Sequence, residues 1–126
     1  MARKIPQSRS SQGKPGASSS SGLPSSAAKP AVLEIYDTTL RDGEQTPGVH
    51  LSYEQKMDIA RDLAAMGVKT IEAGFPASSP GDMEAIKGVS RIMRDCEVAA
   101  LARCKRSDVD AVIEAVSNAA HPVIHI

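Results

Sequence analysis

The residues best suited to chemistry lie in one short stretch, residues 36–45. It follows the mostly apolar run 31–35 and holds three acids, one arginine, two threonines and a glutamine. Arg41 and Asp42 are adjacent, and Gly43 gives the backbone freedom to turn directly after them. Two interpretations follow: a solvated loop with a local ion pair, or a carboxylate site for a metal or a substrate.

Three more residues of this kind occur in or at the end of apolar segments: Glu72, Arg103 and His125. Glu72 interrupts an otherwise apolar strand, and a buried carboxylate needs a partner, for which Arg41 is the natural candidate. His125 could equally be a hydrogen-bonded core histidine, and Arg103 could be a solvated residue at a strand end.

The elements that must position these residues alternate along the chain. Strands are predicted at about 32–38, 68–75, 97–103 and 123–126. A helix is predicted between each strand and the next. This β-α-β-α-β-α-β order indicates right-handed crossovers and a parallel sheet.

Each predicted helix has a start signal and an apolar face. Ser52 and Gln55 form a capping box, Gly67 ends that helix, Pro80 suits a first turn, and Ser107 is predicted to cap the third helix. The three apolar faces are Ile59, Ala60, Leu63, Ala64 and Met66; Met83, Ile86, Val89 and Met93; and Val109, Val112, Ile113 and Val116.

This order fits an open doubly wound sheet or part of a (β/α)₈ barrel. The first turn lacks a glycine-rich dinucleotide loop, which favours the barrel. A full barrel needs about 250 residues and eight strands. Because this sequence supplies four and ends inside an apolar strand, we expect the N-terminal half of a barrel in an incomplete chain. Barrel active sites lie at the carboxyl ends of the strands, so the polar residues should meet there, where they would suit a divalent metal and an anionic substrate.

The composition limits the class of protein to which this chain can belong. The chain has 126 residues, 41% of them hydrophobic, and no net charge, which allows one modest domain over residues 31–126. Residues 1–30 are rich in Ser, Pro and Gly and contain five basic residues and no acid. They predict a disordered leader, or alternatively an organellar transit peptide. We therefore expect a cytoplasmic protein, or a plastid stromal one if the leader is a transit peptide.

The sequence argues against a nucleic-acid-binding, a membrane-spanning and a disulfide-bonded protein. Aromatic residues make up only 2% of the chain, so base stacking on nucleic acid is not expected. No apolar run is long enough to cross a bilayer. Cys96 and Cys104 flank one predicted strand and would lie about 26 Å apart, too far for a disulfide. We expect two reduced thiols.

The stretch 37–45, followed by Pro47 and Gly48, resembles the signature of the 2-isopropylmalate synthase family and its relatives, the homocitrate and citramalate synthases. The resemblance continues through 71–76, 78–82 and 100–104. These later segments are most similar to the isopropylmalate branch, and the resemblance runs from about residue 33 to the end.

The resemblance implies a (β/α)₈ barrel that condenses acetyl-CoA with 2-oxoisovalerate in leucine biosynthesis, using a divalent metal (Mn, Mg or Zn). It implies that Asp42 is a metal ligand and that Arg41 and Glu72 are catalytic, Arg41 by stabilising an enolate-like oxygen. Arg41, Gln45 and His125 would bind the keto acid. The full-length protein would be a homodimer. The base that deprotonates the acetyl group is not assigned.

The sequence also departs from the family. The expected His-x-His metal pair is missing, because His121 and His125 are four residues apart. We therefore predict that this polypeptide alone has no synthase activity. Two alternatives remain: homocitrate or citramalate synthase, and a non-catalytic half-barrel with a binding or regulatory role.

Overall fold

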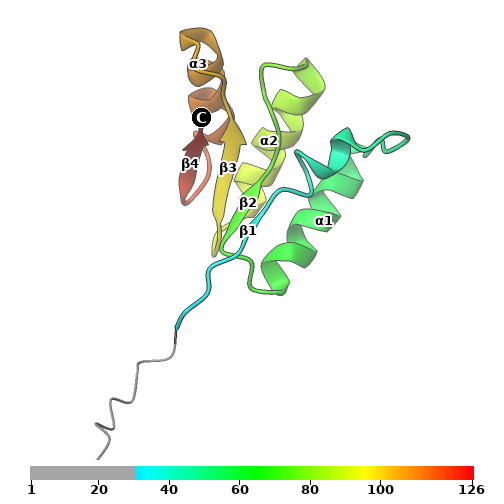
Figure 1. Ribbon diagram of the computed structural model, residues 1–126, viewed down its shortest axis with the longest axis vertical. Coiled ribbons are helices and arrows are strands. Elements are labelled where there is room, and N and C mark those ends of the chain that lie inside the picture. The colour runs from blue at the N-terminus through cyan, green and yellow to red at the C-terminus, as the bar shows by residue number, and fades with distance from the viewer. Residues whose placement is uncertain (1–30) are drawn as a thin grey trace, which may run out of the picture. The chain divides into compact units, whose positions relative to one another are not determined.

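The computed structural model describes residues 31–126, and Val32–Ile126 form one compact unit (Figure 1). Four parallel strands form one sheet in the order β1-β2-β3-β4. The strands are β1 Tyr36–Asp37, β2 Thr70–Glu72, β3 Glu97–Leu101 and β4 Pro122–His125. The helices are η1 Gly43–Gln45, a 3₁₀ turn, and α1 Tyr53–Ala65, α2 Pro80–Ile92 and α3 Arg106–Val116. The predicted alternation of strands and helices is confirmed.

The core lies between the sheet and the helices. Alternate strand residues Ile71, Val98 and Ala100 are fully buried in it, together with Ile86 and Val89 of α2. Because side chains alternate between the two faces of a strand, the residues next to Ile71, including Glu72, belong to the opposite face. That face carries the candidate site.

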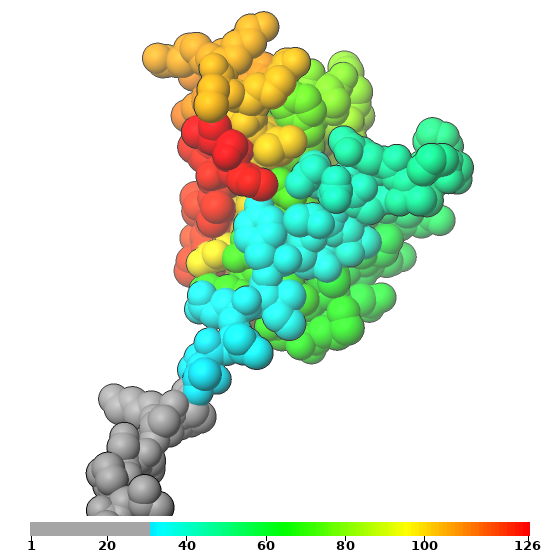
Figure 2. All heavy atoms as spheres, in the orientation of Figure 1, coloured from blue at the N-terminus to red at the C-terminus, as the bar shows by residue number. Residues whose placement is uncertain are grey.

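The sheet is curved. The rings of Tyr36 on β1 and His125 on β4 meet edge to face, with 5.8 Å between their centroids. In a flat sheet these strands would lie about 14 Å apart, three spacings of roughly 4.8 Å. Figure 2 shows β4, in red, beside the cyan residues that surround β1 on one face. This inward curvature is the curvature that a closing barrel requires.

The predicted strands β1, β2 and β3 were too long, most of all β1, and the predicted β4 was displaced by one residue. Residues 32–34 form no strand, and Leu33 is 89% exposed. Pairing begins at Ile35, whose carbonyl accepts hydrogen bonds from the backbone N–H groups of Lys69 and Thr70. Among residues 31–126, no strand lies beside the apolar residues Val32 and Leu33 to pair with them.

The helix starts were predicted with mixed success. Ser52 and Gln55 form the expected capping box, and Ser79 caps α2 ahead of Pro80. The prediction for Ser107 was wrong: α3 begins at Arg106, and Lys105 is its N-cap without a side-chain hydrogen bond.

Two predicted core residues were also wrong, since Met66 and Ile113 are exposed. Met66 follows the last helical residue of α1 as its C-cap. On α3 the buried face is rotated toward α2, where the Ala115 carbonyl accepts a hydrogen bond from the Ser90 hydroxyl at 3.1 Å. Asp108 and Ala115 are therefore buried, and Ile113 is not.

The proposed leader, residues 1–30, lies outside the described residues, so its disorder stays a prediction. Both cysteines are free, as expected, Cys96 buried and Cys104 exposed. Within residues 31–126, every helix is too short or too polar to cross a membrane.

Candidate active site at the carboxyl ends of the strands

The buried carboxylate of Glu72 is the centre of the site. Its side chain is 0% exposed, and both oxygens have partners. Oε2 accepts a hydrogen bond from Arg41 Nε at 3.0 Å, and Oε1 lies 2.6 Å from His125 Nδ1. The predicted Glu72–Arg41 pair is therefore confirmed, and the cluster joins residues from the ends of three strands.

The sheet register explains how His125 reaches Glu72 across the intervening strand. Glu72 pairs with Ala99 on β3, and Ala99 pairs in turn with Val123 on β4, two residues before His125. The methyl side chain of Ala99 leaves space above the strand. Because a carboxylate only accepts hydrogen bonds, His125 Nδ1 is the protonated nitrogen, and Nε2 remains for another partner.

A tight loop positions Arg41. The carbonyl of Thr38 accepts hydrogen bonds from the backbone N–H groups of Arg41, Asp42 and Gly43, at 3.1, 2.8 and 3.1 Å. Before this turn, the Asp37 carboxylate accepts from the Thr39 backbone N–H at 2.9 Å. These short-range bonds turn the chain sharply, so that the Arg41 guanidinium points back to the end of β2.

Asp42 lies on the solvent side of Arg41. Its Oδ1 accepts a hydrogen bond from Arg41 Nη1 at 3.1 Å, and its side chain is 63% exposed. Arg41 thus bridges a buried carboxylate and an exposed one. Within residues 31–126, no group of three or more His, Cys, Asp or Glu side chains is placed to hold a metal. A hard divalent cation takes about six oxygen ligands, so Asp42 fits as one ligand and not as a complete site.

Gln45 and Arg41 share a cavity of about 200 Å³. It is lined by Arg41, Glu44, Gln45, Gly74, Phe75, Ser78 and Asp82. Polar groups come from the segment after β1, and the apolar wall comes from Phe75 after β2. Glu72 and His125 are not among its lining residues. The structure therefore brings Arg41 into contact with the carboxylates of Glu72 and Asp42. Gln45 shares the lining of the cavity with Arg41.

Tyr36 is part of the cluster and was missed by sequence reasoning. Its ring packs against His125, and burial together with the nearby negative charge of Glu72 raises the pKa of Tyr36 to about 12. The available signal was its position on the first strand, on the same face as the polar residues.

Arg103 does not join the cluster. Its Nε donates to Asp108 at 2.5 Å, and its guanidinium carbon lies 5.3 Å from the centroid of the Phe75 ring. Such a cation–π contact helps to hold the Phe75 ring, which lines the cavity. Arg103 therefore acts on the apolar wall of the cavity, not on Glu72.

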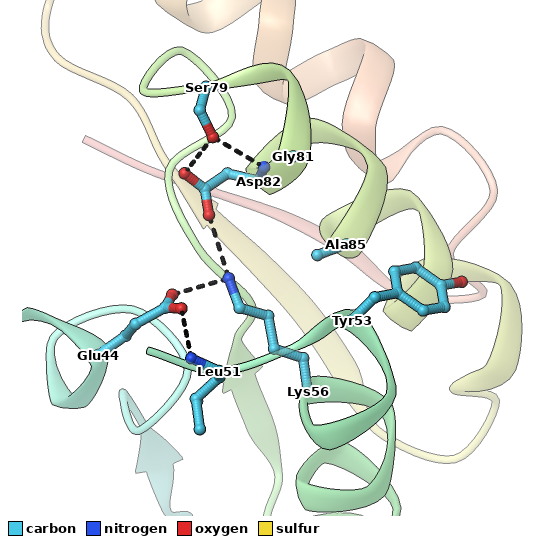
Figure 3. Close-up of a pocket in the computed structure, with 8 residues that line it drawn as sticks. All are labelled: Glu44, Leu51, Tyr53, Lys56, Ser79, Gly81, Asp82 and Ala85. Carbon is cyan, nitrogen blue, oxygen red and sulfur yellow. Dashed lines mark hydrogen bonds and ion pairs between the residues drawn. The ribbon is translucent and has the colours of Figure 1, made fainter. Parts of the chain in front are cut away.

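A second ionic cluster was also missed. Lys56 of α1 lies between the carboxylates of Glu44 and Asp82, with its Nζ directed at both (Figure 3). A signal did exist: Lys56 falls in helical register with Ile59 and Leu63, so a charge interrupts the apolar face of α1.

The match to known proteins agrees with this geometry. The family model described as HMGL-like matches residues 32–126. The chain belongs to the HMGL-like family. This is a TIM-barrel family, so the predicted α/β barrel class and the suspected relationship are both confirmed.

Individual relatives of the chain carry a more specific name than the family does. The chain is 56% identical over 94 residues to a 2-isopropylmalate synthase of Halothermothrix orenii, and 50% identical over 94 residues to those of Staphylococcus carnosus and Staphylococcus aureus strain JH9. Each match covers 75% of this chain and 18% of the relative. The chain thus spans about a fifth of the length of these relatives.

Proposed function

We propose that this chain supplies the first part of the active site of a 2-isopropylmalate synthase, which condenses acetyl-CoA with 2-oxoisovalerate. The observation that carries the proposal is the Arg41 guanidinium, fixed by buried Glu72 and adjacent to exposed Asp42. The names of the relatives support the choice of 2-oxoisovalerate over the keto acids of the homocitrate and citramalate synthases.

Arg41 is the proposed binding and catalytic group for the keto acid. Among residues 31–126 it donates through Nε and Nη1, so its Nη2 hydrogens remain for a substrate oxygen. A guanidinium held in place before reaction offers donors where negative charge develops in the transition state. Gln45 lines the same cavity and supplies a neutral polar contact, while Phe75 faces the aliphatic part of the substrate.

Glu72 is proposed to act through its neighbours. Since both oxygens are occupied and the side chain is fully buried, it positions Arg41 and sets the tautomer of His125. The His125 side chain is partly exposed. Its Nε2 is then the ring nitrogen proposed to meet the substrate.

Asp42 is proposed as one ligand of a divalent metal. Arg41 contacts Asp42 through Oδ1, so Oδ2 is the oxygen proposed to meet the metal. When bound, such an ion supplies Lewis-acid polarisation of the ketone. Its further ligands would lie outside residues 31–126 in a full-length synthase, which we propose to be a homodimer in the cytoplasm, or in the plastid stroma if residues 1–30 act as a transit peptide.

The first test measures keto-acid binding to the chain by ¹⁵N NMR titration. We expect 2-oxoisovalerate to shift the resonances of Arg41 and Gln45, and Arg41→Lys to abolish the effect. Arg106→Lys is the matched control, because Arg106 makes an exposed ion pair with Asp110 and neither residue lines the cavity. Stronger binding of 2-oxoglutarate or pyruvate would favour the homocitrate or citramalate alternative, and no shift with any keto acid would refute the proposal for this chain.

A second test follows CoA release by the purified chain with acetyl-CoA, 2-oxoisovalerate and Mn²⁺ or Mg²⁺. We expect no turnover, since one carboxylate does not complete a metal site. Turnover that disappears in Asp42→Ala would contradict this expectation.

A further inference from the structure

A buried lysine connects the two loops that form the candidate cavity. The Lys56 side chain is 6% exposed. Its Nζ lies 2.7 Å from Glu44 Oε2 and 3.1 Å from Asp82 Oδ1. Glu44 belongs to η1, next to Gln45, and Asp82 to the first turn of α2 (Figure 3). One side chain thus reaches the segment after β1 and the segment after β2.

Both partners of Lys56 are themselves anchored. The Glu44 carboxylate also accepts a hydrogen bond from the Leu51 backbone N–H at 3.4 Å. The Asp82 carboxylate accepts from the hydroxyls of Ser78 and Ser79, and the Ser79 hydroxyl accepts from the Asp82 backbone N–H at 3.0 Å. Through Glu44 and Asp82, Lys56 is therefore linked to the backbones of both loops.

These partners form part of the cavity wall. Glu44, Ser78 and Asp82 line the 200 Å³ cavity together with Arg41 and Gln45. Lys56 does not line it, and lies behind this wall in a neighbouring cavity of about 270 Å³ that shares Glu44 and Asp82. Lys56 can therefore affect a bound molecule only through the residues it holds.

The pKa values of Lys56 and Asp82 are both shifted in the direction that favours the charged form. Burial alone would lower the pKa of Lys56, but its hydrogen bonds to Glu44 and Asp82 outweigh burial and hold the pKa above the ordinary value. Burial alone would raise the pKa of Asp82, but the hydroxyls of Ser78 and Ser79, together with Lys56, lower it. Lys56 and Asp82 thus both carry their charges at neutral pH, and their attraction acts across a partly dehydrated site.

We propose that Lys56 is a positioning residue for the pocket: it fixes η1, which follows Arg41 and contains Gln45, against the start of α2. The identity of the ligand rests on the proposed function, whereas the coupling of the two loops does not. Arg41 and Gln45 would then keep their geometry only while Lys56 holds Glu44 and Asp82 together.

The test compares Lys56→Met, which keeps the apolar stem and removes the charge, with Lys56→Arg and with Lys87→Met. Lys87 is the matched control, since its Nζ also joins two elements through a carboxylate, Glu114 of α3 at 2.8 Å, and it lies outside the cavity. Circular dichroism first establishes that each variant is folded. Amide hydrogen exchange and NMR titration with 2-oxoisovalerate then follow.

In Lys56→Met we expect exchange at residues 43–51 and 78–82 to accelerate about tenfold or more, with α3 unchanged. We also expect 2-oxoisovalerate to bind about tenfold more weakly. Lys56→Arg should recover part of both effects, and Lys87→Met should change neither segment. Unchanged exchange in folded Lys56→Met, or equal acceleration in Lys87→Met, would overturn the proposal.

The two proposals fail in different ways. If 2-oxoisovalerate binds neither the unmodified chain nor the variants, the proposed function fails, and the exchange measurement still decides the role of Lys56. If the unmodified chain binds the keto acid and Lys56→Met binds it equally well with unchanged exchange, only the positioning role is refuted.

Discussion

The Glu72 cluster and the Lys56 cluster have opposite arrangements of charge. In one, the buried anion Glu72 lies between Arg41 and His125. In the other, the buried cation Lys56 lies between two carboxylates, Glu44 and Asp82. Both centres are withdrawn from water, and both gather partners from segments that are distant in sequence.

The clusters differ in where their unused hydrogen-bonding groups point. Around Glu72, the partners bond through Nε and Nη1 of Arg41 and Nδ1 of His125, so among residues 31–126 Nη2 of Arg41 and Nε2 of His125 remain without a hydrogen-bond partner. Around Lys56, the carboxylates of Glu44 and Asp82 line the cavity wall and accept hydrogen bonds from Lys56 and from neighbouring loop groups. The comparison teaches that a buried charge with two opposite partners can present a reactive surface or stabilise a wall, depending on where the partners' remaining groups lie.

The largest effect is expected for Glu72→Ala. Removing the fully buried carboxylate leaves Arg41 and His125 without their shared acceptor, and breaking a buried ion pair costs about 3–5 kcal/mol. We expect the free energy of unfolding, measured with urea, to fall by about that amount. Glu114→Ala, which removes an exposed partner of Lys87, should cost less than about 1 kcal/mol. Similar losses in the two variants would show that the Glu72 cluster is not a buried ionic centre.

A smaller loss is expected for Lys56→Met. The carboxylates left behind are about a quarter exposed, so water compensates part of the lost contact. We expect the free energy of unfolding, measured in the same urea experiment, to fall by about 1–3 kcal/mol. If Lys56→Met were more destabilising than Glu72→Ala, the Lys56 cluster and not the Glu72 cluster would contribute more to stability.

The third effect is a pH dependence specific to the Lys56 cluster. The lowered pKa of Asp82 means that its contribution to stability is present above the ordinary aspartate value and is lost as pH falls through the lowered value. We therefore expect unmodified chain to be more stable than Asp82→Asn at neutral pH, and the difference to shrink below about pH 4. A difference that stays constant between neutral and acid pH would exclude an ionised Asp82 as the stabilising group.

The smallest effect concerns the tyrosine of the Glu72 cluster. The raised pKa of Tyr36, about 12, means that its neutral form contributes to stability below its ordinary value of 10.0, a contribution lost as pH rises through 12. An absorbance titration should show a tyrosinate step near 12 that disappears in Tyr36→Phe. Glu72→Gln should lower the midpoint, since it removes a nearby negative charge; an unchanged midpoint would leave burial as the whole cause.

Local sequence signals predicted local structure well. The capping box at Ser52 and the proline at the start of α2 are short-range features that act within a few residues, and both occur where expected. Boundaries were less predictable. Residues 32–34 are apolar enough for a strand, but a strand also needs a neighbour, and none is present there within residues 31–126.

The candidate site was predictable as a set of residues, but only one of its contacts, the Glu72–Arg41 pair, was predicted from the sequence. The types of Arg41, Asp42, Glu72 and His125 marked them as chemical groups, and parallel strands required their ends to meet at one edge. Tyr36 was missed because a tyrosine is ordinary in a strand. Lys56 was missed although its charge interrupts the apolar face of α1, because the sequence does not show which carboxylates would reach it.

By itself, the sequence determined the order of the strands and helices, the parallel α/β class and the residues available for chemistry, because periodicity and capping depend on neighbours along the chain. Only the tertiary structure decided that Glu72 would be shared by Arg41 and His125, which lie 31 and 53 residues away. It also decided that Lys56 would join two loops. These contacts depend on sheet register and curvature, and those arise from packing between distant segments, which no local pattern encodes.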